Sequence, residues 1–342
     1  MKMPLLSICI PTYNRAKYLG AALDSVLNQL SLEQCASIEI CVSDNASTDD
    51  TDEVVRSKSD LGVCSIVYSK NTSNLGFDLN VKNVVGMASG QYCWILGSDD
   101  VLAPGSIDCF LSKLKVSASP SDIYIFPRRS FFSDNLYGDL TQWLTPKGVL
   151  KLNYDFSVRG EFEEYLAEAC SLGAGFSYIS SMIFSRQCWL DIYIPERVIG
   201  SFYVHAFVLA KICHRGGTLE YLDGSYIFCR LGNDSFASEG RIKRVLVDYR
   251  AYQLFSDILE LTGDRRQKYL SLLKLEHSYF KIFKHMCHPA TFRERKQFGQ
   301  VLVEFGYSYP VISVFSVVTT LFFSKLALVV VKLSKMSSAV KN

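Results

Sequence analysis

The sequence predicts an α/β fold with a mostly parallel central sheet over residues 1–240, followed by an α-helical C-terminal region over 241–342. Two observations support this prediction. Up to residue 126, short apolar runs alternate with segments whose apolar residues recur at helical spacing, as in consecutive βαβ units. Polar clusters follow the first, second and fourth apolar runs, which is where sheets of this class bind ligands.

The first half of the domain, residues 1–126, contains five apolar runs that predict strands: Leu5–Ile10, Ile38–Ser43, Cys64–Ser69, Tyr92–Leu96 and Ile123–Phe126. Helical spacing predicts helices at Tyr18–Leu30, Thr51–Ser57 and Asp78–Met87. Pro104 opens a further helix, since proline suits the first helical turn. We expect this half to bind a nucleotide at the carboxyl ends of its strands.

The second half, residues 127–240, is rich in aromatic residues, glycine and serine and shows a less regular pattern. It contains strand-like runs at Ser180–Phe184 and Tyr226–Arg230, and Phe202–Cys213 has helical spacing. From Arg241 onward the pattern is nearly all helical. We therefore expect the sheet to end before residue 241.

The composition is typical of a globular protein with reduced cysteines. Apolar residues make up 49% and charged residues 20%, and the net charge of +2 gives no sign of a nucleic-acid-binding face. The 11 cysteines contain no C-x-x-C pair and lie mostly in apolar runs, which indicates buried thiols. Because the first residues also lack a signal-peptide pattern, we expect the catalytic part to stay in the cytoplasm.

The apolar segment 311–331 has three alternative roles. It is long enough to cross a bilayer, Lys325 lies towards its C-terminal end, and further lysines follow it in the sequence. It could equally lie in the membrane surface as an interfacial helix. The third alternative is a helix packed on the rest of the protein. The first two predict contact with a membrane surface.

Two adjacent acids, Asp99 and Asp100, follow the fourth predicted strand and Ser98, and we expect Ser98 and Asp99 to contact the bound nucleotide sugar. Their carboxylates repel each other unless a cation lies between them and a ligand. Oxygen ligands suit Mg²⁺ or Mn²⁺, and such an ion would neutralise a departing nucleoside diphosphate. The alternative is that the acids only cap the next helix. The sequence thus predicts a metal site at both acids, with Asp100 also a catalytic candidate.

Three further loops at this edge offer groups for a nucleotide. Asp44 follows the second strand and would accept hydrogen bonds from a base or ribose, whereas Ser47–Asp50 suit a helix N-terminus. Asn74 and Gly76 form either a ligand-contacting loop or a plain turn. The loop after the first strand offers a ring, a hydroxyl and a guanidinium, in Pro11, Thr12, Tyr13 and Arg15.

Four motifs in this order resemble the family-two glycosyltransferases of the GT-A fold: S-I-C-I-P-T-Y-N-R, I-C-V-S-D-N-A-S-T-D, N-L-G and W-I-L-G-S-D-D. The resemblance covers roughly residues 5–114. It implies that Thr12, Tyr13 and Asp44 hold the nucleotide of a nucleotide-sugar donor and that Asp99 contacts the metal. The chain departs from the family pattern at Gly97, where the family often has the first acid of its metal-binding motif.

A narrower resemblance, over most of residues 1–244, is to the abequosyltransferases of bacterial O-antigen assembly. It rests on A-G-F-S-Y-I-S-S, I-G-S-F-Y-V-H-A-F and C-R-L-G-N-D-S-F. It implies transfer of a 3,6-dideoxyhexose from a CDP carrier to a polyprenyl-linked oligosaccharide at the inner face of the cell membrane, with the acceptor in the second half. The competing hypothesis is an inactive GT-A module that binds carbohydrate or assists assembly.

The general base is the least defined part of the site. The family usually places an acid near the start of the helix predicted at Phe202, and this chain has His205 there instead. His205 could accept the proton of the acceptor hydroxyl, or it could be a core histidine. The nearest acids are alternative bases: Asp191, Glu196 and Asp223. Three residues after the last strand could close over the diphosphate or form a polar turn: Arg230, Asn233 and Ser235.

Overall fold

The computed structural model describes residues 3–131, 137–145, 151–232, 240–288 and 290–321. The chain forms two compact units. We call them the α/β unit, made of Met1–Gly232 with Gln253–Leu272, and the helical unit, made of Asn233–Tyr252 with Leu273–Asn342. The predicted boundary at residue 240 therefore differs from the observed division.

Tertiary contacts explain this difference. Residues 253–272 follow the predicted boundary in sequence but belong to the α/β unit. The rings of Phe255 and Phe207 pack with centroids 5.4 Å apart, and Arg265 Nε donates to Glu163 Oε1 at 2.8 Å. Helical spacing alone does not reveal which neighbour a helix packs against.

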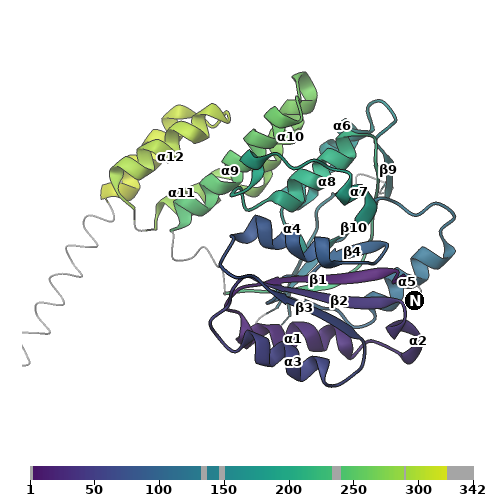
Figure 1. The fold of residues 1–342 in the computed structure, drawn as a ribbon. Helices are drawn as coiled ribbons and strands as arrows, with labels where there is room; N and C mark the ends of the chain where they lie inside the picture. The colour runs from purple at the N-terminus through teal and green to yellow at the C-terminus, as the bar shows by residue number, and fades with distance from the viewer. Residues whose placement is uncertain (1–2, 132–136, 146–150, 233–239, 289, 322–342) are drawn as a thin grey trace, which may run out of the picture. The chain divides into compact units, whose positions relative to one another are not determined.

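Eight strands form the central sheet (Figure 1), in the order β3 (Ser65–Lys70), β2 (Ile38–Asp44), β1 (Leu6–Thr12), β4 (Tyr92–Ile95), β10 (Met182–Ser185), β6 (Ile123–Ile125), β11 (Thr218–Tyr221) and β9 (Asn153–Asp155). The first four are parallel. β10 is antiparallel to β4 and β6, and β6 is parallel to β11. The predicted α/β fold and its mostly parallel sheet are thus confirmed, whereas β9 and β11 were not predicted.

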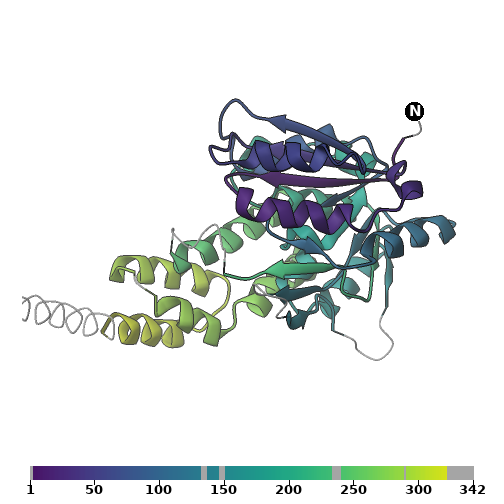
Figure 2. The same ribbon diagram turned by 90° about the horizontal axis from the view of Figure 1, so that it is seen from below.

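Helices cover both faces of this sheet. α1 (Ala16–Leu27) and α3 (Thr51–Ser59) lie side by side on one face, and α4 (Phe77–Met87) and α8 (Val204–His214) pack together on the other (Figures 1 and 2). The apolar residues that predicted α1, Leu19, Leu23 and Val26, are fully buried, as expected for an amphipathic helix. Further helices of the α/β unit are α2 (Leu32–Cys35), α5 (Ser106–Val116), α6 (Glu161–Glu168) and α7 (Arg186–Leu190).

A second, four-stranded sheet was not predicted from the sequence. Its order is β5 (Val101–Leu102), β12 (Ile227–Arg230), β7 (Arg128–Phe131) and β8 (Tyr137–Thr141). β12 is antiparallel to β5, the strand directly after the Asp99–Asp100 pair. This pairing brings the end of β12 to the predicted metal loop from a point far along the chain.

The helical unit is built from α11 (Tyr279–Met286), α12 (Phe292–Glu304), a helix over 309–321, and parts of α9 (Arg241–Ile258) and α10 (Gly263–Glu276). Its buried core includes Tyr249, Ile282, Phe298 and Leu302. None of the helices described here is both long enough and apolar enough to span a bilayer. Residues 322–331 of the predicted membrane-associated segment lie outside the described residues.

The cysteines agree with the prediction of reduced thiols. All 11 are free, and Cys9, Cys41, Cys93 and Cys229 are buried. Burial raises the pKa of the Cys41 thiol to about 12, so the thiol stays protonated and behaves as a small apolar side chain.

Candidate active site

The carboxyl ends of β1 and β2 place Thr12 beside Asp44. Both side chains are buried, Thr12 with 2% and Asp44 with 0% of its surface exposed, and Pro11 at the same strand end is buried as well. The Thr12 hydroxyl has no hydrogen-bond partner within the described part of the chain. An unpaired buried hydroxyl costs about 1–3 kcal/mol. A ligand atom that paired with this hydroxyl would remove the cost, so Thr12 is a candidate for contact with a ligand.

Protein groups hold the Asp44 carboxylate in one orientation. Oδ1 accepts a hydrogen bond from the backbone N–H of Ser47 at 2.8 Å, and Oδ2 accepts one from the Tyr68 hydroxyl at 2.8 Å. Lys70 Nζ lies 3.9 Å from Oδ2. Each carboxylate oxygen has a second lone pair, so Asp44 keeps acceptor capacity for a ligand. Tyr68 and Lys70 were not predicted, because their role depends on the pairing of β2 with β3.

The loop after β1 is tied to the loop after β2. The backbone N–H of Asn14 donates to Ser47 Oγ at 2.9 Å, and the backbone N–H of Thr48 donates to Asn14 Oδ1 at 2.8 Å. Asn14 has a φ of 51°, a left-handed conformation that asparagine adopts more readily than most residues. These contacts leave the Tyr13 ring 43% exposed at the sheet edge, where a base can stack. Arg15 lies half-buried beside it.

Asn45 connects the loop after β2 to the N-L-G segment. Its Nδ2 donates to Asn74 Oδ1 at 2.8 Å and to the backbone oxygen of Gly76 at 3.2 Å. Gly76 has a φ of 85°, so glycine is needed for the backbone conformation. Asn80, 3% exposed on α4, donates to backbone oxygens at the ends of both β1 and β2 at 3.3 and 3.0 Å. Asn74 is thus engaged in a turn, and the unpredicted Asn45 and Asn80 hold the strand ends together.

Asp100 points inward from the loop after β4. Its Oδ2 accepts hydrogen bonds from the hydroxyls of Tyr178 and Ser180, each at 2.6 Å, and its Oδ1 accepts one from the backbone N–H of Arg230 at 3.2 Å. Burial first, and then repulsion from Asp99, raise the pKa of Asp100 to about 6. These contacts argue against the predicted metal and catalytic roles of Asp100 and for a role in positioning the loop.

Gly97 has no room for a side chain. A Cβ at this position would lie 2.9 Å from Asp100 Oδ2 and 3.1 Å from Ser180 Oγ. The Gly97 backbone N–H also donates to Ser180 Oγ at 2.9 Å. The departure from the family pattern at Gly97 therefore has a physical reason: the buried Asp100–Ser180 pair fills the space that a side chain would need.

Asp99 is the half-buried carboxylate of this loop, next to the buried Ser98. Within the described ranges, no group of three His, Cys, Asp or Glu side chains is arranged to hold a metal ion. Mg²⁺, however, is commonly bound by one or two carboxylates together with substrate phosphates. The residues present therefore fit an ion held by Asp99 on the protein side and by a diphosphate on the other.

Arg230, at the end of β12, brings a positive charge to this loop. Its Nε donates to the backbone oxygen of Asp99 at 3.1 Å. Its guanidinium lies over the rings of Phe131 and Tyr18, with centroid distances of 4.5 and 5.2 Å. Stacking fixes the guanidinium plane, which favours bidentate contact with phosphate. Two residues predicted to act with Arg230 lie outside the described residues, Asn233 and Ser235.

A further arginine of the site, Arg128, was not predicted. Its guanidinium lies 4.4 Å from the ring centroid of Tyr178, the same tyrosine that donates to Asp100, and 5.7 Å from that of Trp143. The sequence feature that could have indicated Arg128 is P-R-R, which directly follows the fifth predicted strand at the carboxyl edge of the sheet. Arg128 therefore brings a positive charge close to Tyr178, the residue of the second half that donates to Asp100.

His205 lies in the first turn of α8 and is 2% exposed. Its ring packs against Phe77 and Tyr203 at centroid distances of 6.0 and 5.8 Å, and a hydrogen bond with the backbone of Ser177 opposes the effect of burial on its pKa. Burial lowers the pKa of His205 to about 3. Because a general base works best with a pKa near the ambient pH, this environment favours the core alternative.

Asp78 organises the start of α8 and was not predicted. Its Oδ2 accepts hydrogen bonds from the backbone N–H groups of Gly200 and Phe202 at 2.8 and 2.9 Å, and its Oδ1 accepts one from Val204 at 3.0 Å. Phe202 has a φ of 65°, which is strained for a residue with a side chain. Burial raises the pKa of Asp78, against the opposing effect of hydrogen bonds from the surrounding backbone N–H groups. A buried carboxylate on α4 thus holds the loop in which the family places its base.

The three alternative bases lie in different places. The backbone oxygen of Asp191 accepts from Arg215 Nη1 at 3.1 Å, and Arg215 follows the end of α8 opposite to His205. Glu196 and Asp223 are exposed. Asp223 follows β11, which runs in the same direction as β4, so its strand ends at the site edge of the sheet.

Comparison with known proteins identifies the chain's relatives. The model of the family described as "Glycosyl transferase family 2" matches residues 7–178. The chain is 33% identical to abequosyltransferase RfbV of Salmonella typhimurium over 342 residues, which is 99% of both chains. It is 34% identical to the GalNAc(5)-diNAcBac-PP-undecaprenol beta-1,3-glucosyltransferase of Campylobacter jejuni over 112 residues, which is 32% of this chain and 35% of that protein.

The fold is also found in solved structures. The crystal structure of S. aureus TarS 1-349 in complex with UDP-GlcNAc superimposes with a TM-score of 0.61, covering 88% of this chain and 80% of that one. The two sequences are 18% identical, so the likeness concerns the fold. The predicted GT-A architecture is confirmed.

Proposed function

The chain belongs to glycosyl transferase family 2, and we propose that it transfers a 3,6-dideoxyhexose such as abequose from a CDP-linked donor to a polyprenyl-linked oligosaccharide at the inner face of the cell membrane. Glycosyl transfer itself follows from family membership. The choice of sugar is supported by the 33% identity to an abequosyltransferase along the whole chain. The choice of a lipid-linked acceptor is supported by the likeness to an enzyme whose name specifies an undecaprenol-linked saccharide.

The observation that carries the proposal is the buried, unpaired hydroxyl of Thr12 beside the oriented carboxylate of Asp44. A nucleobase and its ribose offer both donors and acceptors, so they can pair with the two side chains at once. The exposed ring of Tyr13 would stack on the base. In this arrangement the diphosphate extends from β1 towards the loop after β4.

The diphosphate would meet Arg230 and Asp99. The stacked guanidinium of Arg230 supplies charge-assisted hydrogen bonds, and Arg15 adds a second cation at the start of α1. Asp99 would hold Mg²⁺ or Mn²⁺, which when bound neutralises charge on the leaving nucleoside diphosphate. Asp100, with its pKa raised to about 6, keeps this loop in place through Tyr178, Ser180 and the backbone of Arg230.

Transfer also needs a base for the acceptor hydroxyl. The burial of His205 supports a core role for it, and the exposed carboxylates of Glu196 and Asp223 are the remaining acids predicted from the sequence. The alternative function, an inactive module, would not need an unpaired Thr12 hydroxyl or an oriented Asp44. It is therefore the less favoured hypothesis.

Thermal shift with CDP, UDP, GDP and dTDP in the presence of Mg²⁺ or Mn²⁺ tests the donor. We expect CDP to raise the melting temperature most. Thr12→Val sharpens the test, because valine has the same shape without the hydroxyl. This variant should fold at least as stably as the wild type, since it removes an unpaired polar group, yet bind the nucleotide about fivefold to tenfold more weakly. The absence of any nucleotide effect, or unchanged affinity in Thr12→Val, would contradict the proposed site.

A further inference from the structure

The last described helix, over 309–321, buries two polar side chains beside Ile312 and leaves apolar side chains exposed. Ser316 is 8% and Thr319 1% exposed, whereas Val314, Val317 and Leu321 are 58%, 50% and 57% exposed. An amphipathic helix on a water-soluble surface shows the opposite distribution, with its apolar stripe against the core. The exposed side chains recur at the spacing of one helical face, so they form a continuous apolar strip.

Close packing against α12 explains why this face of the helix is turned inward. A Cβ on Gly299 of α12 would lie 2.9 Å from Ile312 Cγ2, which means that the two helices approach closely through a glycine. Ser316 Oγ donates to the backbone oxygen of Ile312 at 3.0 Å, and Thr319 Oγ1 donates to that of Phe315 at 2.7 Å. The buried hydroxyls are therefore satisfied within their own helix and need no water.

Two exposed aromatic side chains lie near the start of the helix, apart from the strip itself. The Tyr279 hydroxyl accepts a hydrogen bond from the backbone N–H of Ser308 at 2.7 Å, which places the beginning of α11 beside the beginning of the helix. Tyr309 and Phe280 at these two positions are 68% and 76% exposed. Contiguous exposed apolar area of this kind marks an interaction surface, whereas single exposed apolar residues do not.

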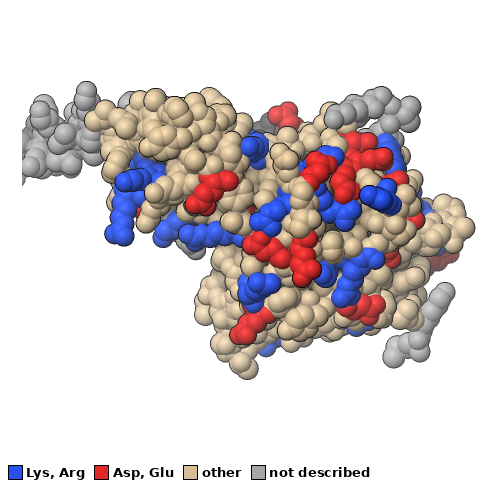
Figure 3. Space-filling model, turned by 90° about the horizontal axis from the view of Figure 1, so that it is seen from above, with Lys and Arg blue, Asp and Glu red and all other residues tan. Residues whose placement is uncertain are grey.

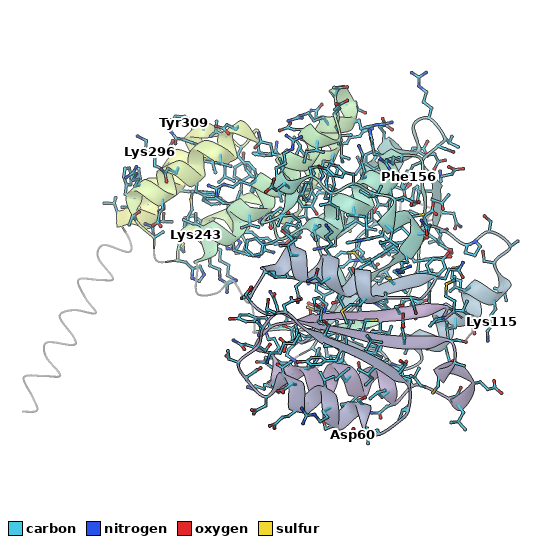
Figure 4. All side chains as sticks on the ribbon, viewed as in Figure 1. Asp60, Lys115, Phe156, Lys243, Lys296 and Tyr309 are labelled. Atoms are coloured by element: carbon cyan, nitrogen blue, oxygen red, sulfur yellow. The ribbon has the colours of Figure 1, made fainter. Side chains whose placement is uncertain are left out.

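The helical unit is also strongly basic. Its described residues include ten lysines and arginines but four aspartates and glutamates, although the whole chain has a net charge of +2. Lys281 and Lys284 lie one turn apart on α11 beside Phe280. Figure 3 shows an area without charged side chains on this unit, bordered by lysine and arginine side chains. In Figure 4, Lys296 and Tyr309 lie on the same side of the unit.

We propose that the outward face of the helix over 309–321 docks onto a bilayer that contains anionic lipids. The apolar strip would enter the boundary between headgroups and acyl chains, and the surrounding lysines and arginines would pair with lipid phosphates. This surface is independent of the nucleotide and sugar proposed above. It would bring the enzyme to the layer that holds a lipid-linked acceptor.

Co-sedimentation of the full chain with lipid vesicles tests the proposal. Binding is expected to phosphatidylcholine vesicles that contain phosphatidylglycerol, and to be weaker with phosphatidylcholine alone. The double variant Val314→Asp with Val318→Asp should bind at least about tenfold more weakly, since it places two charges in the apolar strip. The matched control, Leu32→Asp with Leu61→Asp, adds the same charge at exposed leucines of the α/β unit and should bind as the wild type does.

Melting curves by circular dichroism decide whether the valine variant is folded, and Val314→Ser with Val318→Ser replaces it if it is not. Equal vesicle binding by the folded valine variant and the wild type overturns the proposal. Absence of binding to both kinds of vesicle also overturns it. Gel filtration then tests whether the chain forms a dimer that the valine substitutions dissociate. In that case the strip is an interface between two copies of the chain.

Discussion

Replacing Asp78 with asparagine is expected to loosen the start of α8 without changing the size of the side chain. The Asp78 carboxylate accepts three backbone N–H groups, two at Oδ2 and one at Oδ1. An amide keeps one oxygen, which can serve Gly200 and Phe202. Its NH₂ group would face the N–H of Val204, donor against donor, so this buried N–H would lose its partner.

The size of the effect follows from these three bonds. An unpaired buried N–H costs about 1–3 kcal/mol, so Asp78→Asn should lower the free energy of unfolding by about 2 kcal/mol. Asp78→Ala removes the acceptor of all three N–H groups and should cost about 3–4.5 kcal/mol, at roughly 1–1.5 kcal/mol per bond. The positive φ of Phe202 makes this loop sensitive, because that conformation is strained for a residue with a side chain.

Urea unfolding followed by circular dichroism measures these changes. Asp60→Asn is the matched control, since Asp60 is an exposed acid at the end of α3, far from α4 in Figure 4. The control should change the free energy of unfolding by less than about 0.5 kcal/mol. Because the loop carries the position of the family's base, sugar transfer should fall more than donor hydrolysis in Asp78→Asn. If Asp78→Asn unfolds at the same urea concentration as Asp60→Asn, the proposed role of Asp78 is refuted.

Three further predictions concern the site. Asp99→Asn should lose at least about 10²-fold in turnover and require more metal, measured by donor turnover in a Mn²⁺ titration; full activity in EDTA would contradict this. Burial and Asp99 raise the pKa of Asp100 in the folded state to about 6, above the value of 3.8 in the unfolded chain. Between about pH 4 and 6 the folded state therefore binds more protons than the unfolded state, and the stability that Asp100 contributes falls as the pH rises through this range. Unfolding of Asp100→Asn across this range should show a smaller decline than wild type, and an equal decline would mean that Asp100 does not titrate there. His205→Gln should keep near-normal turnover on the true acceptor, and a loss beyond about 10²-fold at unchanged donor affinity would restore His205 as the base.

The nucleotide-binding half could be predicted from the sequence because its signals are local. The apolar runs of β1, β2 and β4 are buried on both faces of a parallel sheet, so each is continuous and easy to recognise. Parallel strands separated by helices bring their carboxyl ends to one edge. The grouping of Thr12 with Asp44 therefore follows from chain order alone, and the register of β1 with β2 confirms it.

Other features depend on pairings between distant parts of the chain, which only the tertiary structure decides. Asp100 was predicted as a metal ligand because it stands beside Asp99, but Tyr178, Ser180 and the end of β12 turn it inward. His205 occupies a position suited to a base, but the rings of the neighbouring helices exclude water from it and depress its pKa. The sequence by itself determined which residue types stand at the strand ends. Folding decided which of them remain accessible to a ligand, because burial and hydrogen bonds come from neighbours that lie far away in the chain.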